Sequence, residues 1–478
     1  MVMAPRGARE KADDMTPPCD EHARHITLEI LDRFFGHVPP RDIAIRLWDG
    51  TAWPRHLSPD RRSATIFLNY PWSLRRMLLP PTDRTLGEAY LRGDFDITGD
   101  IEAPFQLMEQ MKDLPSRAIA LARLVHLLRQ LPEGPEPEPF MHDAATLRGM
   151  RHSRQRDRAA VRYHYDVSND FYALWLDVRM TYSCAYFETG DEDLNAAQEA
   201  KYDLICRKLR LRPGERLLDL GCGWGGLVIH AAERYGVQAT GVTLSVQQAV
   251  LARQRVNDAG LTSRAHILLD DYRDLPTTTP YDKIVSVGMF EHVGRSRLPE
   301  YFTTAYRLLK VSGLFLNHGI ARQHDFQNPA RRMLARELSA RASFVGNYVF
   351  PDGELVPISE SLGLAERAGW EVRDVESLRE HYARTLRSWS ERLARQSNEA
   401  IRIAGPETYR LWRLFMAGAA HGFEREHLSV YQALLAKPDR SGNAHLPLTR
   451  MDIYADSPPE ENGPNEARIE AVSLYDPS

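Results

Sequence analysis

One short segment of the sequence combines glycines with a preceding acid in a pattern suited to binding a ligand. Asp219 belongs to the hydrophobic run 216–220, and the loop 221–226, with the sequence GCGWGG, follows directly. Glycines let a ligand approach the backbone closely because they carry no side chain. A glycine loop alone is weak evidence. Its place between a predicted strand and a predicted helix indicates a cofactor site that includes Gly221 and Gly223.

The elements that must position this loop alternate between strands and helices. The expected strands are residues 216–220, 238–244, 265–271, 281–289 and 313–318, and the expected helices are residues 227–235, 245–258 and 299–309. This alternation predicts an α/β fold with a parallel sheet and helices on both faces. Open sheets of this kind bind ligands at the carboxyl ends of their strands, where the glycine loop is expected to lie.

Polar side chains near the ends of three strands extend the predicted cofactor site. Asp219 is expected to point into the cleft. Asp271 is expected to accept a hydrogen bond from an adenine amino group, and Tyr272 to stack on the ring. The second strand does not end in an acid, so Thr243 and Gln248 are expected to bind the ribose hydroxyls instead.

The composition narrows the class of protein. The chain has 478 residues, of which 43% are hydrophobic and 26% charged, as in globular proteins of two or more domains. A net charge of −4 gives no general attraction to nucleic acid, so no nucleic-acid partner is expected. The four scattered cysteines predict no disulfide framework and no metal site, and they fit a cytoplasmic setting. No run reaches the roughly 20 apolar residues that cross a bilayer.

A segment rich in proline and acid, residues 131–140, divides the chain, because proline suits a linker better than a core element. The predicted organisation is listed from the N-terminus: disordered residues 1–24, an N-terminal domain at 25–130, a linker at 131–147, a catalytic domain at 148–440 and a largely disordered tail at 441–478. Within the N-terminal domain, residues 42–48 and 64–68 are predicted strands.

Two basic segments each allow two interpretations. A helix over residues 118–131 places Arg123, His126 and Arg129 opposite its leucines, as a core-facing helix or a membrane-surface helix would. We favour the core-facing helix. The arginines between residues 148 and 162 either form a solvated surface or meet phospholipid head groups.

Six blocks in a fixed order carry a family resemblance. They are HYDVSND at 164–170, YSCAY at 182–186, the glycine loop, GVT at 241–243, DYRD at 271–274 and MFEHVG at 289–294. In this order they resemble the cyclopropane-fatty-acyl-phospholipid synthases, relatives of the mycolic acid cyclopropane synthases, from about residue 42 to about residue 434. The resemblance implies a class I S-adenosylmethionine-dependent methyltransferase (Rossmann-like) domain with a smaller α+β N-terminal lipid-binding domain. It also implies S-adenosylmethionine as the cofactor, with Tyr182, Ser183 and Leu244 beside it.

Enzymes of that family pass a methyl group to one carbon of a cis double bond, and the resulting carbocation loses a proton from the new methyl as the ring closes. A bound bicarbonate takes this proton. The resemblance implies a bicarbonate cage made of Cys184, Glu291, His318, Tyr382 and the backbone of Ile320. Histidine, tyrosine and thiol groups can donate to an oxyanion, while a glutamate can accept from the bicarbonate hydroxyl. The four side chains are therefore the expected catalytic residues. Cys184 is not expected to act as a covalent nucleophile.

Three cage residues also allow a purely structural interpretation. Cys184 could be a buried apolar residue, His318 a hydrogen-bonded structural histidine, and Glu291 a helix cap. Their joint occurrence in matched blocks favours the catalytic interpretation. The arginine-rich stretch 331–341 aligns poorly and is either a surface helix or part of the lipid path.

The resemblance implies unsaturated membrane phospholipids as the substrate and a cytoplasmic enzyme peripherally associated with the inner face of the membrane. It also implies a homodimer. Three alternatives stay open: a fatty-acid methyltransferase giving methyl-branched or methylene products, a small-molecule N-methyltransferase, and an inactive lipid-binding protein. The N-terminal domain argues against the N-methyltransferase, and the intact loop and cage argue against the inactive protein.

Overall fold

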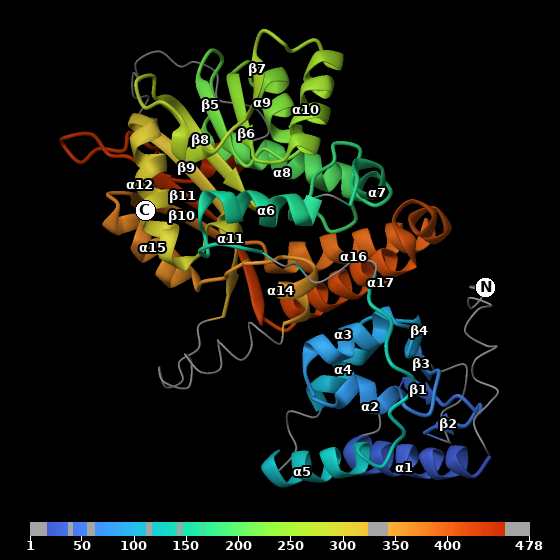
Figure 1. The fold of residues 1–478 in the computed structure, drawn as a ribbon. Coiled ribbons are helices and arrows are strands. Elements are labelled where there is room, and N and C mark those ends of the chain that lie inside the picture. Colours follow the sequence, from blue (N-terminus) through green and yellow to red (C-terminus); the bar gives the residue numbers. More distant parts are fainter. Residues whose placement is uncertain are drawn as a thin grey trace, which may run out of the picture.

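Two modules make up the computed structural model, which describes residues 17–36, 42–54, 63–110, 117–140, 145, 147–165, 167–323 and 343–454. In Figure 1 the N-terminal module lies below a larger module built on a second sheet. The arginine-rich stretch 331–341 lies outside the described residues, so its role stays a prediction.

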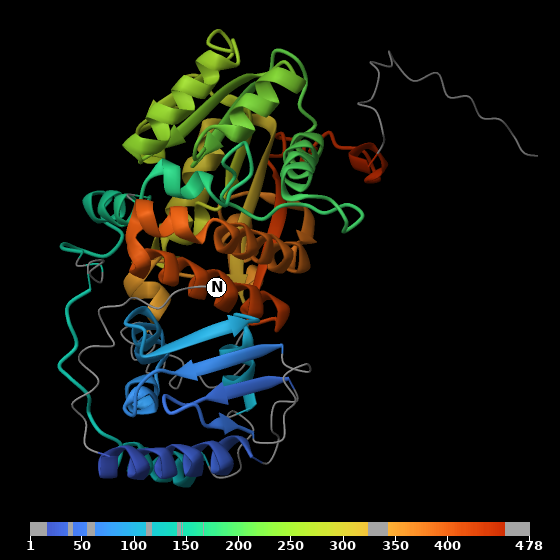
Figure 2. The same cartoon turned by 90° about the vertical axis from the view of Figure 1, so that its right-hand side faces the viewer.

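The N-terminal module is a four-stranded sheet, in the order β2-β1-β3-β4, with helices packed on it. Its elements are α1 (Pro17–Phe35), β1 (Ile43–Arg46), β2 (Ala52–Trp53), β3 (Ala64–Leu68), α2 (Ser73–Leu78), α3 (Asp83–Leu91), β4 (Phe95–Gly99), α4 (Ala103–Gln110) and α5 (Arg117–Leu128). The predicted strand 64–68 is confirmed, whereas the strand predicted over 42–48 is shorter. Figure 2 shows α1 and α5 side by side, on the side of the sheet away from the larger module.

Helix α1 corrects the expectation of disorder over residues 1–24. It begins at Pro17, and Ala23 and Ile26 are buried in the core of the module. Helix α5 has the core-facing character that we favoured, since Leu124, Leu127 and Leu128 are buried.

The proline-rich segment 131–140 forms neither helix nor strand, and it packs back onto α2. Arg75 donates to the carbonyl of Leu131 at 2.7 Å, and Arg76 donates to the carbonyl of Pro135. The link between the modules is therefore held against the N-terminal module over its first residues.

The larger module is a seven-stranded sheet in the order β10-β11-β9-β8-β5-β6-β7. Its strands are β5 (Arg216–Leu220), β6 (Gln238–Thr243), β7 (Ala265–Leu269), β8 (Tyr281–Val287), β9 (Leu309–Arg322), β10 (Glu371–Ser377) and β11 (Leu428–Ala436). Strands β5 to β9 are parallel, but β11 and β10 add an antiparallel edge, so the prediction of a parallel sheet is wrong for these two strands. Pairing with β11 also extends β9 beyond the predicted 313–318, and His318 lies inside the strand.

Helices cover both faces of this sheet. The helices of this module are α6 (Arg154–Tyr165), α7 (Asn169–Ala173), α8 (Leu194–Leu209), α9 (Gly226–Arg234), α10 (Val246–Asp258), α11 (Phe290–Val293), α12 (Leu298–Leu308), α14 (Phe344–Tyr348) and α15 (Ile358–Arg367), of which α14 packs against α3 of the N-terminal module. Side chains alternate between faces along a strand. Leu217 of β5 joins the core that contains α8, α9 and α10, whereas Leu218 and Leu220 join the core that contains α12 and α15. By the same alternation, Asp219 faces α8.

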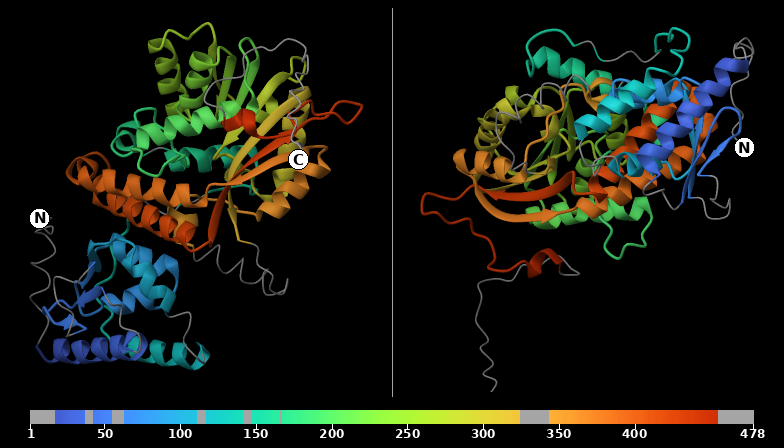
Figure 3. Two further views of the ribbon diagram at one scale, coloured as in Figure 1. Left: turned by 180° about the vertical axis from the view of Figure 1, so that it is seen from behind. Right: turned by 90° about the horizontal axis from the view of Figure 1, so that it is seen from below.

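Helices α16 (Arg379–Arg395) and α17 (Ser397–Glu424) lie between the modules, as Figure 3 shows from two further sides. Helix α17 contributes buried side chains to the cores of both modules. Leu411 and Leu414 pack in the N-terminal module, while Trp412 and Met416 pack in the larger one. Arg410 of the same helix donates to the backbone of β4. The two modules therefore share one continuous packed interior.

The end of the described chain corrects the expectation of disorder from residue 441 onward. Helix α18 (Met451–Tyr454) buries Ile453, and Asp452 accepts from Arg210 at 2.6 Å. Residues 455–478 lie outside the described part of the chain.

Candidate active site

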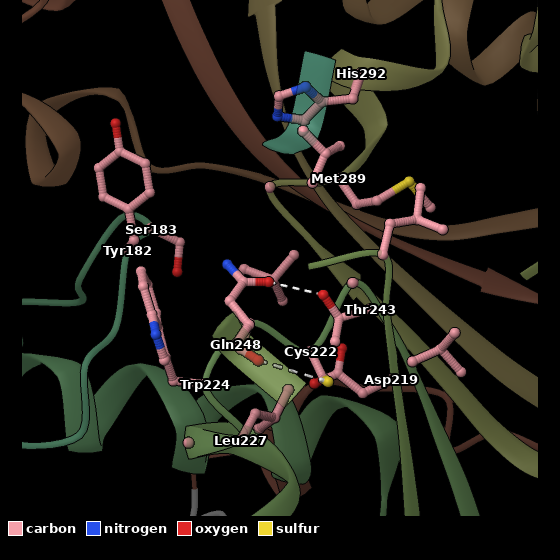
Figure 4. A pocket seen from close by; sticks show the side chains of 18 of the residues that line it. Tyr182, Ser183, Asp219, Cys222, Trp224, Leu227, Thr243, Gln248, Met289 and His292 are labelled. Atoms are coloured by element: carbon pink, nitrogen blue, oxygen red, sulfur yellow. Dashed lines mark hydrogen bonds between the residues drawn. The ribbon is translucent and has the colours of Figure 1, made fainter. Parts of the chain in front are cut away.

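A cavity opens at the carboxyl ends of β5, β6 and β8, where the parallel sheet was expected to bind a ligand. Figure 4 shows side chains from the YSCAY segment, the glycine loop, β6 and α10 around it. Nine of the ten predicted cofactor residues line this cavity: Tyr182, Ser183, Asp219, Gly221, Gly223, Thr243, Leu244, Gln248 and Tyr272. Sequence blocks that are far apart along the chain thus meet at one place.

The glycine loop leaves room for a ligand beside its backbone. Gly221 has φ of +87°, and a Cβ atom there would lie 2.8 Å from the Cβ of Met289. Gly223 has φ of +53°, and a Cβ atom there would meet no protein atom within 4 Å. A side chain at Gly223 would therefore occupy the cavity itself, which explains the need for glycine.

Asp219 is the buried acid of the cavity. Its Oδ1 atom has no hydrogen-bond partner among the described residues, and burial raises its pKa to about 7. The positive charge of Lys201 partly opposes this shift. A buried, unsatisfied carboxylate oxygen facing a cavity indicates a missing hydrogen-bond donor from a ligand.

Thr243 and Gln248 contact each other, as expected for two residues predicted to bind the same ribose. The hydroxyl of Thr243 donates to Oε1 of Gln248 at 2.7 Å, which is the bond drawn between them in Figure 4. The hydroxyl of Ser245 caps helix α10 by accepting a hydrogen bond from the backbone amide of Gln248, and this bond fixes the loop between β6 and α10.

Asp271 is the predicted cofactor residue that does not line the cavity. Both of its carboxylate oxygens bond to the guanidinium of Arg273, at 2.8 and 2.7 Å, and Asp270 lines the cavity in its place. Because Asp271 bonds to Arg273 and does not line the cavity, its position does not support the expected hydrogen bond to adenine. The predicted strand end was also two residues too late, because β7 ends at Leu269.

Lys201 is a site residue that the sequence did not reveal. It lies on α8, is almost fully buried, and donates to Oγ of Ser183 at 2.8 Å. Burial lowers its pKa to about 8, and the nearby acids Asp177 and Asp219 oppose this shift. Lysines on amphipathic helices are usually exposed, so helical periodicity alone could not identify it.

Electrostatic interactions and hydrogen bonds link the predicted cage residues. Tyr382 interacts with Cys184 and Glu291, and Lys201 interacts with both Cys184 and His318. Glu291 of α11 accepts from the backbone amide of Ile320 at 2.6 Å, so it does not cap its own helix. Its second oxygen, Oε2, is buried without a partner among the described residues, and burial raises the pKa of Glu291 to about 7. The backbone of Ile320 was expected to hold bicarbonate, and in this structure its amide donates to Glu291 instead.

His318 presents a similar unsatisfied atom. Its Nδ1 atom lies 3.3 Å from Nε2 of Gln432, whereas its Nε2 atom is buried with no partner among the described residues. Burial and the nearby charges of Lys201 and Lys208 hold the pKa of His318 well below its usual value, so the ring is neutral. A structural histidine would be expected to satisfy both nitrogens.

Cys184 and Tyr382 complete the cage. The Cys184 thiol donates to the carbonyl of Ala185 at 3.2 Å, and burial raises its pKa strongly, so it stays protonated. A protonated thiol is a poor nucleophile, in agreement with the expected non-covalent role. Burial raises the pKa of Tyr382, and the nearness of Cys184 and Glu291 raises it further.

Aromatic side chains surround the cage and the inner end of the cavity. Tyr182 packs against Trp175, Trp389 and Trp412 with ring centroids 5.2 to 5.9 Å apart. Trp412 also stands next to Phe415 on α17, toward the N-terminal module. Tyr182 is therefore enclosed by aromatic side chains.

Two of the arginines on α6 make ion pairs with acids of the larger module. Arg156 bonds to Asp352, and Arg154 donates to Asp274 at 2.6 Å. Arg156 is mostly buried in its pair, so the structure favours a role in packing for it, whereas Arg154 is exposed.

Comparison with known proteins identifies the fold and the family. A family model described as mycolic acid cyclopropane synthetase matches residues 152–433. A Pseudomonas putida protein named probable fatty acid methyltransferase is 41% identical over 418 residues, covering 87% of this chain and 97% of the relative. Cyclopropane mycolic acid synthase 1 of Mycobacterium tuberculosis is 39% identical over 275 residues, covering 57% and 95%. The crystal structure of mycolic acid cyclopropane synthase CmaA1 complexed with SAH and CTAB has a TM-score of 0.54 at 38% identity, covering 58% of this chain and 97% of that one.

The sheet, the glycine loop and these similarities define a class I S-adenosylmethionine-dependent methyltransferase fold, as predicted. The chain belongs to the mycolic acid cyclopropane synthetase family, whose members are S-adenosylmethionine-dependent enzymes that modify lipids. The predicted family resemblance is thereby confirmed. In the described residues, we find no helix with the length and apolar character needed to cross a bilayer.

Proposed function

We propose that this protein converts the cis double bonds of phospholipid acyl chains into cyclopropane rings, with S-adenosylmethionine as the donor and bicarbonate as the proton acceptor. The observation that carries the proposal is that two buried atoms, Oε2 of Glu291 and Nε2 of His318, have no hydrogen-bond partner among the described residues. When bound, S-adenosylmethionine supplies an activated methyl group and bicarbonate supplies a base.

The residues of the cavity fit S-adenosylmethionine. Asp219 can accept from donors of the cofactor through its unpartnered oxygen, and Gly221 and Gly223 leave the backbone accessible. Thr243 and Gln248 offer oxygen and amide groups to the ribose. Tyr272 offers a ring face to the adenine. Each of these residues lines the cavity.

The residues of the cage fit a small oxyanion with one hydroxyl group. His318 and Tyr382 can donate hydrogen bonds, and the carboxylate of Glu291 can accept one and so orient the anion. Because Glu291 already bonds to the Ile320 amide, one of its oxygens is fixed and the other is left to receive the hydroxyl. A base held this way can take a proton without the protein supplying a nucleophile.

Two features support an acyl chain as the substrate. The aromatic enclosure around Tyr182 shelters a carbocation from water, which would otherwise trap it. The apolar packing also continues from Trp412 through Phe415 and Phe350 toward the N-terminal module. We expect the N-terminal module to handle the lipid. Peripheral contact with the inner face of the membrane and a homodimeric state stay predictions.

The test uses the full-length protein, vesicles of unsaturated phospholipid and labelled S-adenosylmethionine. Mass spectrometry of the acyl chains should show the addition of one CH2 unit that survives hydrogenation with the ring intact. A product with a reducible double bond would reject ring formation. Absence of label in the acyl chains would reject a lipid substrate altogether.

A second candidate, a fatty-acid methyltransferase that leaves a methyl or methylene group, is favoured by the names of two relatives. The Pseudomonas putida protein and a Mycobacterium tuberculosis protein 38% identical over 401 residues are each named a probable fatty acid methyltransferase. A methylene product differs from the ring only in which proton the carbocation loses, and it keeps a double bond that hydrogenation reduces. A saturated methyl branch requires a hydride from a reductant, and its two additional hydrogens distinguish it from the ring by mass.

A further inference from the structure

Three polar side chains form a row across adjacent strands behind the cage. His318 on β9 is directly opposite Gln432 on β11, and Gln432 is directly opposite Glu376 on β10. His318 is 2% exposed and Gln432 is 1% exposed. Residues paired in register have side chains on the same face of a sheet. This face is the one that α8 covers, since Leu316 and Leu434, two positions along from His318 and Gln432, pack in the core that contains α8.

Lys208, on the helix α8 that covers this face of the sheet, contacts two of these three side chains. Its side chain is fully buried, and its ammonium pairs with the carboxylate of Glu376 and donates to Oε1 of Gln432 at 2.8 Å. The amide Nε2 of Gln432 in turn lies 3.3 Å from Nδ1 of His318. The connected chain therefore runs from Glu376, which is 24% exposed at the side chain, to the buried imidazole.

The chemistry of these groups fixes the direction of every hydrogen bond in the chain. An ammonium has donors only, so it requires the oxygen of the Gln432 amide to face it. The amide nitrogen of Gln432 then faces His318, and an NH2 group can only donate, so Nδ1 of His318 must accept. A neutral imidazole that accepts at Nδ1 carries its proton on Nε2.

We propose that Lys208 and Gln432 are positioning residues that set the tautomer of His318, so that Nε2–H is the donor presented to the anion of the cage. The identity of that anion rests on the proposed function, but the tautomer does not. The arrangement explains why Nε2 is the nitrogen without a protein partner. It also explains the presence of a fully buried lysine, which touches neither the cavity nor the cage.

The tautomer can be measured directly by NMR on full-length protein labelled with [15N]histidine. The two nitrogens of His318 are identified by their loss in His318→Asn. We expect a protonated Nε2 and an unprotonated Nδ1 in the wild-type protein. In Lys208→Met or Gln432→Leu, we expect mixed or reversed protonation, while Lys208→Arg, which keeps a donor-only group, should retain the wild-type pattern. A proton on Nδ1 in the wild type, or an unchanged pattern in Lys208→Met, would overturn the proposal.

Lys283→Met is the matched control, since Lys283 is also a buried lysine on this sheet, paired with Glu215 at 3.9 Å. It should leave the His318 nitrogens unchanged. If Lys283→Met altered them as much as Lys208→Met, the effect would be a general response to losing a buried charge, and the inference would fail.

A kinetic measurement separates this inference from the proposed function. Lys208→Met should raise the bicarbonate concentration for half-maximal turnover by about tenfold, the effect of weakening one hydrogen bond to an anion, with unchanged affinity for S-adenosylmethionine. An unchanged bicarbonate requirement would contradict the positioning role. If wild-type turnover did not depend on the bicarbonate concentration, bicarbonate would be refuted as the anion of the cage. The NMR measurement of the His318 tautomer would then decide whether the present inference holds.

Discussion

Glu291 accepts a hydrogen bond from the Ile320 amide at 2.6 Å through Oε1, while its buried Oε2 has no partner in the described part of the chain. One carboxylate thus has one oxygen held by the backbone and one oxygen available to a ligand. This relationship joins α11 to β9 across the carboxyl edge of the sheet, and it makes Glu291 the most directly testable residue of the cage.

We predict that Glu291→Gln lowers turnover by about 100-fold, within the range for loss of a general acid–base group. The amide that replaces the carboxylate cannot serve as well as an acceptor for the anion's hydroxyl. Affinity for S-adenosylmethionine, measured by calorimetry, should change little because Glu291 does not line the cofactor cavity. Parallel losses of affinity and turnover would contradict this assignment.

The raised pKa of Glu291 predicts the pH dependence of turnover. Both oxygens of Glu291 can accept hydrogen bonds together only when the carboxyl is ionised, and burial raises its pKa to about 7. Turnover at saturating cofactor and fixed bicarbonate should therefore rise as the pH increases through about 7, where a solvent-exposed glutamate would already be fully ionised. Glu291→Gln should lose this rise.

Asp219 needs a separate control, since burial raises its pKa to about 7 as well. Asp219→Asn should change the pH dependence of cofactor affinity and leave the rise in turnover in place. A rise that disappears in Asp219→Asn and persists in Glu291→Gln would reverse the two assignments.

We predict that Cys184→Ala lowers turnover, whereas Cys206→Ala does not. Both thiols are fully buried and burial raises both pKa values, so the two substitutions remove the same volume from similar surroundings. Only Cys184 adjoins the cage. Equal losses of turnover in the two variants, measured with labelled S-adenosylmethionine, would reduce the role of Cys184 to packing.

We predict that Gly223→Val abolishes binding of S-adenosylmethionine, because the new side chain would fill the cavity. Gly214→Val is the control: Gly214 also has positive φ, at +80°, and open space beside it, but it lies outside the cavity wall. Both variants carry backbone strain, so only steric exclusion separates them. Normal affinity of Gly223→Val in calorimetry would refute the placement of the cofactor.

The sequence-based predictions were correct where structure depends on local interactions, and they failed where it depends on tertiary contacts. The strand 64–68 and the glycine loop depend on local alternation and turn chemistry, and both lie where they were predicted. Asp271 was misplaced because periodicity cannot tell which of two adjacent acids faces inward once the chain leaves the sheet. Lys201 and Lys208 could not be identified because only their tertiary contacts distinguish them from exposed helical lysines.

The contact between the modules gives the last prediction. Arg410 of α17 donates to the carbonyls of Tyr90 at 2.6 Å and Phe95 at 2.8 Å and pairs with Asp96 at 2.5 Å. Arg410→Met would remove these contacts between the modules, and the loss should lower the free energy of unfolding by about 2 kcal/mol. Arg402 on the same helix is exposed and pairs only with Glu399 among the described residues, so Arg402→Met should leave stability unchanged. Urea unfolding that gave the same midpoint for both variants would show that the packed interior, and not the arginine, holds the N-terminal module in place.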